Sequence, residues 1–252
     1  MLVKILVAMH KASQVPTEEP YLPVQVGRAL SAEIDGTMGD HTGENISDKN
    51  LNYCELTAVY WAWKNLTADY VGLCHYRRYF AQYGLKNKKK RILKQQQIQK
   101  ILQQYDVIVP KKRHYWIETN YSQYIHAHHA QDLDETRVIL QEKYPEYLPA
   151  FDGCMKQTSG HRFNMFVMKK PLFDAYCAWL FDVLFTLEQR LDITQYSAYD
   201  ARVFGFVSER LLDVWLKTNR IQYKEMPVVY TEKQNWIKKI WRFLKRKITA
   251  GK

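Results

Sequence analysis

Residues 70–80 are YVGLCHYRRYF, and they give the strongest indication of an α/β fold. The run over residues 70–74 is short and apolar, which predicts a buried β-strand. Six side chains rich in hydrogen-bond donors and rings follow it directly, in the order His75-Tyr76-Arg77-Arg78-Tyr79-Phe80. Because ligands bind beyond the carboxyl ends of the strands in open α/β sheets, this turn is a candidate binding site.

The N-terminal residues show the same arrangement. Val3–Met9 is an apolar, β-branched run that predicts a second buried strand, and it ends at His10-Lys11. Residues 12–49 are rich in Gly, Pro, Asp, Thr and Ser, which predicts a long loop with room for one strand or short helix.

Helices and further strands are expected along the rest of the chain. Apolar side chains at helical spacing predict a helix over about residues 51–65, with Asn52 and Glu55 as a capping box. The other expected elements are helices over residues 95–104, 121–143, 172–190 and 198–217 and strands over 106–109, 163–168 and 226–230. This succession predicts an α/β domain with a mostly parallel central sheet flanked by helices.

The amino-acid composition limits the kinds of ligand that the chain is expected to bind. The 37 Lys and Arg residues against 26 Asp and Glu residues give a formal net charge of +11, which favours polyanions, acidic lipids or phosphorylated ligands. The 18 Tyr and 7 Trp residues suit a site that stacks on the rings of sugars or bases. The four Cys residues lie far apart without a CxxC pair, so we expect reduced thiols and neither a zinc ribbon nor a disulfide framework.

The N-terminal and C-terminal segments lead to different predictions about targeting and membrane binding. The N-terminal apolar stretch is interrupted by Lys4 and lacks a small-residue cleavage site, so no signal peptide is expected. No run of about 18 apolar residues predicts a transmembrane helix. Residues 236–248 combine an apolar stripe with Lys and Arg, which predicts a basic amphipathic helix. We therefore divide the chain into a main domain, residues 1–232, and a C-terminal helix, residues 233–252, that lies on a membrane or, alternatively, docks on the domain.

His75, Arg77 and Arg78 are candidates for binding a diphosphate. A guanidinium group offers two parallel N–H donors and stays charged when it is partly buried. Because side chains alternate in direction along a strand, we expect one of the two arginines to face the site and the other to pair with an acidic neighbour. The alternative is a structural cluster of ion pairs.

Two other groups of polar residues stand out. The stretch over residues 43–50 precedes a predicted helix, where free N–H groups and Lys49 favour an anion, unless its side chains only cap the helix. His126, His128 and His129 lack the spacing of a known metal site, so we favour a polar helix face that lines a substrate cleft. Asp132, Asp200 and Glu209 are candidate general bases.

The absence of several motifs excludes other enzyme classes. The sequence contains no GxGxxG, no GxxxxGK[ST] and no GxSxG, which argues against dehydrogenases, P-loop ATPases and α/β-hydrolases.

Six segments together resemble one family. They are VAMHK, PVQVGRAL, GENISDKNLNYCELTAVYWAWKN, YVGLCHYRRYF, NMFVMKK and ARVFGFVSERLLDVWL, in this order over about residues 3–227. The family is that of bacterial capsular and exopolysaccharide glycosyltransferases, long known as a domain of unknown function and marked by the HYRRY motif. It is similar to GT-A glycosyltransferases. The resemblance implies a nucleotide-binding α/β catalytic domain, a UDP-sugar donor and a polyprenyl-diphosphate-linked glycan acceptor, with galactose or galactofuranose as the favoured sugar.

The resemblance also implies positions for individual residues. The donor pocket would be lined by His10, Lys11, Asp40, Asn45, Ser47 and Lys49. The place of the metal-binding DxD motif of many GT-A enzymes is taken by His75, Arg77 and Arg78, and the acceptor-side candidates are His126, His129 and Asn164. Cations at the DxD position favour transfer without a metal, with Mn²⁺ or Mg²⁺ as the alternative.

An inverting transfer would need a carboxylate that deprotonates the acceptor hydroxyl, and Asp132 is the first choice. The expected location is the cytoplasmic face of the plasma membrane, held by residues 236–248. Two alternatives remain. One is a non-catalytic UDP-sugar-binding subunit of a polysaccharide assembly complex, and the other is a basic nucleic-acid-binding protein, although the basic residues form no known nucleic-acid-binding motif.

Overall fold

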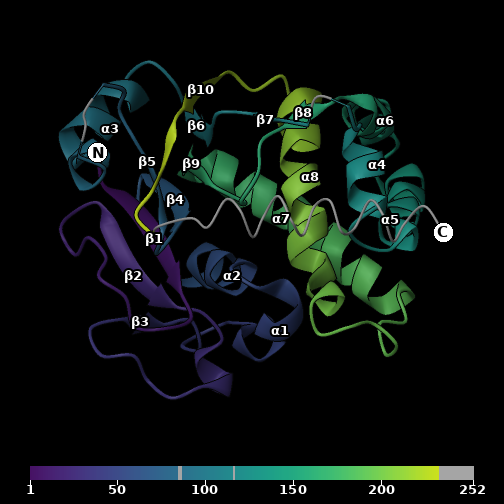
Figure 1. Cartoon of the computed structure of the whole chain (residues 1–252), viewed down its shortest axis with the longest axis horizontal. Coiled ribbons are helices and arrows are strands. Elements are labelled where there is room, and N and C mark those ends of the chain that lie inside the picture. The colour runs from purple at the N-terminus through teal and green to yellow at the C-terminus, as the bar shows by residue number, and fades with distance from the viewer. Residues whose placement is uncertain (85–86, 116, 233–252) are drawn as a thin grey trace.

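The structure is a computed structural model, and it describes residues 1–84, 87–115 and 117–232. Within these residues, one sheet of nine strands forms the centre of the molecule (Figure 1). The strands of its main path follow the order β10-β6-β9-β4-β1-β2-β3, while β5 pairs with both β4 and β11. The bounds are β1 Val3–Met9, β2 Tyr21–Gln25, β3 Met38–Gly39, β4 Tyr70–His75, β5 Arg78–Phe80, β6 Val107–Pro110, β9 Phe166–Lys169, β10 Tyr223–Met226 and β11 Val228–Tyr230.

Most neighbouring strands along the main path are parallel. The pairs β1–β2, β1–β4, β2–β3 and β6–β10 are parallel, and β9 runs antiparallel to both β4 and β6. The expected α/β fold with a mostly parallel central sheet is therefore confirmed. A separate small sheet pairs β7 (Arg113–His114) with β8 (Ser159–Gly160).

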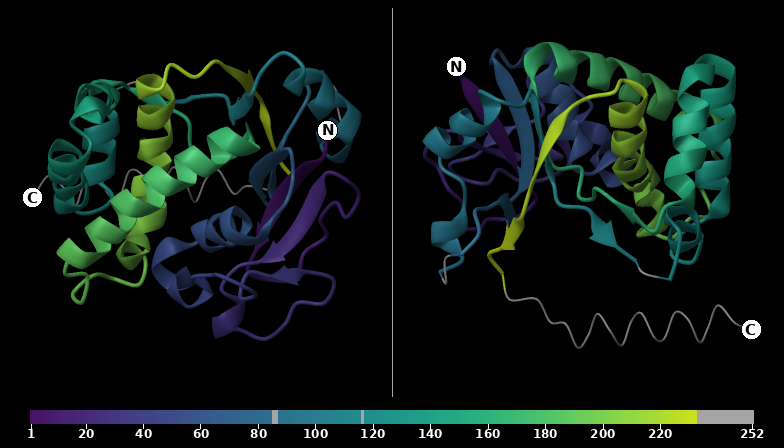
Figure 2. Two further views of the ribbon diagram at one scale, coloured as in Figure 1. Left: turned by 180° about the vertical axis from the view of Figure 1, so that it is seen from behind. Right: turned by 90° about the horizontal axis from the view of Figure 1, so that it is seen from above.

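Helices cover both faces of the sheet (Figure 2). The helices of the described residues are α1 Asn50–Tyr53, α2 Leu56–Asn65, α3 Gln95–Leu102, α4 Asn120–Ile125, α5 Ala130–Lys143, α6 Leu148–Lys156, α7 Lys170–Arg190 and α8 Val203–Thr218. Leu6 and Ala8 of β1 belong to the larger core, which includes residues of α2 and of α5 to α8. Ile5 and Val7 belong to a second core with residues of α3. Because both faces of β1 are buried, its sequence is apolar except at Lys4.

Several expected elements differ in the structure. The strand expected over residues 226–230 is split into β10 and β11, and the strand expected over residues 163–168 begins only at Phe166. The long loop over residues 12–49 contains two strands, β2 and β3, because β2 pairs in parallel with β1. The helix expected over residues 51–65 is broken into α1 and α2 at Cys54, which has a φ of 54°. The helix expected over residues 121–143 is broken into α4 and α5, with His126–His129 between them. In each case a local apolar pattern gives no sign of the long-range contact that sets the boundary.

The C-terminal helix expected over residues 233–252 lies outside the described residues. Among the residues that are described, no helix combines the length and apolar character needed to cross a bilayer.

Gly72 of β4 tests the packing at the centre of the sheet. A Cβ atom there would lie 2.9 Å from the Phe166 carbonyl oxygen and 2.9 Å from a Val167 methyl group. We expect Gly72→Ala to lower the free energy of unfolding by about 1–3 kcal/mol, measured by urea denaturation, because the backbone oxygen cannot move away cheaply.

Gly153→Ala is the matched control, since a Cβ in α6 would meet only the flexible Nζ of Lys217. Ala is favoured over Gly in a helix by roughly 0.5–1 kcal/mol, so this variant should be unchanged or more stable. Equal destabilisation of the two variants would contradict the tight approach of β4 to β9.

Candidate active site

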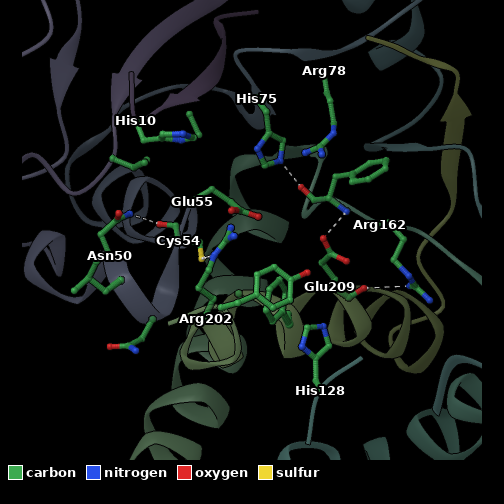
Figure 3. Close-up of a pocket in the computed structure, with 18 of the residues that line it drawn as sticks. His10, Asn50, Cys54, Glu55, His75, Arg78, His128, Arg162, Arg202 and Glu209 are labelled. Carbon is green, nitrogen blue, oxygen red and sulfur yellow. Dashed lines mark hydrogen bonds between the residues drawn. The ribbon is translucent and has the colours of Figure 1, made fainter. Parts of the chain in front are cut away.

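A pocket of about 910 Å³ opens beyond the carboxyl ends of β1, β2 and β4 (Figure 3). Its sheet side is lined by Ala8, His10, Val26 and the turn over residues 75–78. Its other side is formed by the segment that enters α2, by Arg162 and Phe163, and by the start of α8. This volume is within the range of about 300–1,000 Å³ that is usual for small-ligand sites.

The lining of the pocket is strongly cationic. Six of the lining residues are arginines, namely Arg77, Arg78, Arg113, Arg162, Arg202 and Arg210, against two glutamates, Glu55 and Glu209. Low-dielectric walls lined by one sign of charge concentrate ions of the other sign. The pocket is therefore suited to an anionic ligand.

Arg78 stacks on two aromatic rings and has no ion-pair partner among the described residues. Its guanidinium carbon lies 4.5 Å from the ring centre of Phe163 and 5.9 Å from that of Tyr230. Its Nε is buried and has no hydrogen-bond partner. In the described part of the chain, no carboxylate oxygen lies within the 4.0 Å that defines an ion pair with Arg78. Because a buried charge without a partner is costly, an anion that reaches Arg78 is stabilised.

Arg77 differs from its neighbour. Its side chain is 42% exposed, and its Nη1 lies 3.7 Å from the carboxylate of Glu232. Its guanidinium also lies over the ring of Tyr76, 5.2 Å from the ring centre. Arg77 is thus paired with an acid at the mouth of the pocket, whereas Arg78 lies deeper and unpaired.

The dipeptide Phe163-Asn164 connects the ionisable groups of the pocket. Both residues have left-handed backbone conformations, with φ of 77° and 52°. The Phe163 carbonyl accepts a hydrogen bond from His75 Nε2 at 2.6 Å, and the Phe163 N–H donates to Glu209 at 3.1 Å. The Asn164 amide donates to Glu55 at 2.8 Å. Strained backbone of this kind is concentrated at functional sites, and here it positions side chains from three different elements.

His10 and His75 favour the neutral state while the pocket is empty. Burial lowers the pKa of His75, with Glu55 acting in the opposite direction and Arg78 adding to the decrease. Burial and the charge of Arg77 lower the pKa of His10. Each imidazole can therefore take up a proton when an anion enters.

The residues expected from the sequence divide into two groups. Those that line the pocket are His10, His75, Arg77, Arg78 and Glu209. Lys11 lies beside this group, with its Nζ 5.4 Å from the Tyr76 ring centre and 3.7 Å from Glu232.

The four residues between positions 40 and 49 that were expected in the donor pocket do not line it. They stabilise a loop instead. Asp40 is buried and accepts hydrogen bonds from the Gly27 and Arg28 N–H groups and from the Ser47 hydroxyl. The Asn45 amide donates to two carbonyl groups of its own turn, and Lys49 pairs with Glu188 at 2.7 Å. These four residues support the loop that carries Asn50 to the pocket wall.

Asp132 and Asp200 also lie outside the pocket lining. Asp132 is buried, and it accepts hydrogen bonds from Tyr124 at 2.8 Å and Tyr196 at 2.7 Å. Burial raises the pKa of its carboxyl group, against the effect of the two tyrosines. Asp200 accepts hydrogen bonds from His128 and Ser197. A base must reach the hydroxyl that it deprotonates, and neither carboxylate faces this cavity.

The three residues expected on the acceptor side do not lie together in the structure. His126 pairs with Glu118 at 2.8 Å, and the His129 ring stacks on Tyr196 with ring centres 4.0 Å apart. Neither lines the pocket. Asn164 is buried behind the wall and contacts Glu55. Among the residues that the structure describes, no group of three or more His, Cys, Asp or Glu side chains could hold a metal ion.

Several lining residues were not expected from the sequence, above all Glu55 and Arg202. Glu55 fits a capping box with Asn52, but the helix breaks at Cys54, so Glu55 precedes α2 and its carboxylate contacts Asn164. Arg202 donates to Cys54 Sγ at 3.1 Å and lies over Phe206. No local signal distinguished Glu55 and Arg202 from the other charged residues of the two predicted helices.

Comparisons with known proteins agree on the kind of domain. A family model described as a domain of unknown function, DUF4422, matches residues 4–220. No curated protein matches the chain. A solved structure described as the apo form of WbbM, a bifunctional glycosyltransferase, superposes with a TM-score of 0.84 and 33% sequence identity. That match covers 92% of this chain and 45% of the other, so this chain spans less than half the length of that glycosyltransferase.

The histidines give a direct test for an anion site. NMR titration should find the pKa of His75 and of His10 below the usual 6.5, and inorganic pyrophosphate should raise both, because a bound anion stabilises the imidazolium form. The resonances of His126, outside the pocket, should not move on adding pyrophosphate. Titration curves of His10 and His75 that pyrophosphate leaves in place would argue against an anion in this pocket.

The same shifts set the direction of a pH effect on stability. The unfolded chain binds these protons more readily than the folded one. The neutral histidines therefore make their full contribution to the free energy of unfolding above pH 6.5, and this contribution is lost as the pH falls.

Proposed function

The chain belongs to the DUF4422 family, and we propose that it is a glycosyltransferase that moves a hexose from a UDP-sugar to a lipid-linked glycan. The observation that carries this proposal is the half-buried, unpaired Arg78, with its buried Nε, at the carboxyl edge of the sheet, inside a cation-rich pocket. The similarity to a glycosyltransferase structure supports it independently.

The pocket's charges fit the demands of glycosyl transfer. When the bond between the sugar and the diphosphate breaks, negative charge develops on the departing UDP. In this proposal Arg78, Arg77 and His75, once it is protonated, stabilise that charge. We propose that these groups do so without a metal ion. The favoured donor is UDP-galactose in its pyranose or furanose form, as the family resemblance suggests.

A catalytic function is favoured over a purely binding one by the two carboxylates. A site that only retains a diphosphate is weakened by a nearby negative charge, yet Glu55 and Glu209 both line the pocket. Binding to nucleic acid is less well supported, because the arginines line a concave pocket and single-strand binders use an extended basic groove.

Arg78→Ala tests the proposal. Hydrogen bonds to charged groups contribute about 1.5–3 kcal/mol, so we expect about a ten- to hundred-fold loss of UDP affinity by calorimetry, together with loss of transfer. Chelator should change neither property of the wild-type protein. The transfer assay would use a panel of UDP-hexoses, including UDP-galactose and UDP-galactofuranose, with octyl β-galactoside as the acceptor.

Arg137→Ala is the matched control, because Arg137 forms its ion pair with Asp152 on the surface, outside the pocket lining. Unchanged UDP affinity in Arg78→Ala, or an equal loss in both variants, would remove Arg78 from the donor site.

Residues 236–248 support a proposal about location that rests on sequence. Their Lys and Arg side chains would each add about 1 kcal/mol at an anionic membrane surface. In the full chain, replacing Lys245 and Lys247 by Glu should weaken sedimentation with phosphatidylglycerol vesicles. The same charge change at the exposed residues Lys156 and Lys224 should have little effect. Equal loss in both double variants would reject a membrane-binding segment.

A further inference from the structure

We infer that Glu55 is the group that accepts the proton of the acceptor hydroxyl during transfer, and that Asn164 positions it. This inference rests on the proposed glycosyltransferase function and assigns a catalytic residue within the same pocket. It is argued from the hydrogen bonds and ion pairs of the two carboxylates that line the cavity.

Glu209 is already fully engaged. One of its oxygens accepts the Phe163 N–H at 3.1 Å, and the other lies 3.2 Å from Nη1 of the buried Arg210. The Arg210 guanidinium also donates to Gln123 at 2.7 Å, which holds the pair in place. To take a proton, Glu209 would have to leave Arg210 as a buried charge without its partner, which is costly.

Glu55 has one free oxygen. Its Oε1 accepts the Asn164 amide at 2.8 Å. Among the described residues, its Oε2 accepts no hydrogen bond, and no Lys, Arg or His nitrogen lies within 4.0 Å of the carboxylate. Figure 3 shows this carboxylate pointing into the open centre of the pocket, between His75 and Arg202. A carboxylate in a cation-rich cavity that forms no ion pair is available for another partner.

The position of Glu55 is set by a buried hydrogen-bond network. Asn164 is only 3% exposed, and its amide also donates to the Gly205 carbonyl at 3.1 Å. Its side-chain oxygen accepts the Ser208 hydroxyl at 2.9 Å. The left-handed Cys54 directs the chain into α2, so that Glu55 faces the cavity from the helix start. A base held in this way is oriented before any substrate arrives.

The proposed step conserves atoms and charge. The acceptor oxygen forms a bond with the anomeric carbon of the donor sugar. The bond from that carbon to the diphosphate oxygen breaks, and its electron pair stays on the departing UDP beside Arg78. The proton of the acceptor hydroxyl passes to Oε2 of Glu55 and is released to water when the product leaves.

Glu55→Gln is the central test. Gln has nearly the same size and can still accept the Asn164 amide, but it cannot take the proton. We expect the rate of transfer from the best donor of the UDP-hexose panel to octyl β-galactoside to fall about 10²- to 10⁴-fold. UDP affinity should stay within about threefold. Glu135→Gln, at the Arg190 ion pair outside the pocket lining, is the matched control and should transfer normally.

Chemical rescue separates a base from a structural residue. In Glu55→Ala, formate can enter the vacated space and take the proton, so transfer should recover as the formate concentration rises. Formate should not restore Arg78→Ala. Asn164→Ala should lower kcat while the KM for the donor stays unchanged, and formate should not rescue it.

The outcomes distinguish this inference from the proposed function. A wild-type protein that binds no UDP and neither hydrolyses nor transfers the sugar of any donor of the panel overturns the proposed function. An active wild type with an equally active Glu55→Gln overturns only the assignment of Glu55. The assignment also fails if Glu55→Gln loses UDP affinity as strongly as it loses transfer, or if Glu209→Gln alone abolishes transfer and keeps UDP affinity.

Discussion

The antiparallel pairing of β9 with β4 is the constraint on which the site depends. Leu73 is paired with Phe166, so the residues just before β9 lie beside the residues that follow β4. The carbonyl of Phe163 therefore meets His75 at the end of β4. In an entirely parallel sheet, the carboxyl end of β4 would meet only other carboxyl ends. The reversed strand brings a second, rigid loop to the same edge.

The loop that brings Phe163 to His75 also contacts the other parts of the pocket. The left-handed Phe163-Asn164 pair directs one N–H to Glu209 on α8 and one amide to Glu55 before α2. This pair of residues thus links the sheet edge to two helices, α2 and α8. Such a network can orient the side chains of the pocket before a ligand binds, because its hydrogen bonds are made between residues of the protein.

The arginines of the pocket serve two purposes that their sequence positions do not reveal. Arg162 is 3% exposed and donates to Tyr115, Asn120 and a backbone carbonyl, so it holds the wall together. Arg210 holds Glu209 in the same way. Arg78 has stacking partners but no anion, which leaves its charge for a ligand. The net charge of the chain therefore overstates the number of positive charges that are free to bind a ligand.

Local pattern was sufficient for the two central strands and for the cations at their ends. β1 is apolar except at Lys4, and β4 is apolar up to His75, because both faces of these strands are buried. His75 ends β4, and His10, Arg77 and Arg78 follow the two strands in sequence. Long-range packing was needed for the carboxylates. Asp132 and Glu55 lie in similar helical patterns, yet one is enclosed by two tyrosines and the other faces the cavity. The difference comes from the break between α1 and α2 at Cys54 and from the contact with Asn164, 109 residues away, neither of which local periodicity encodes.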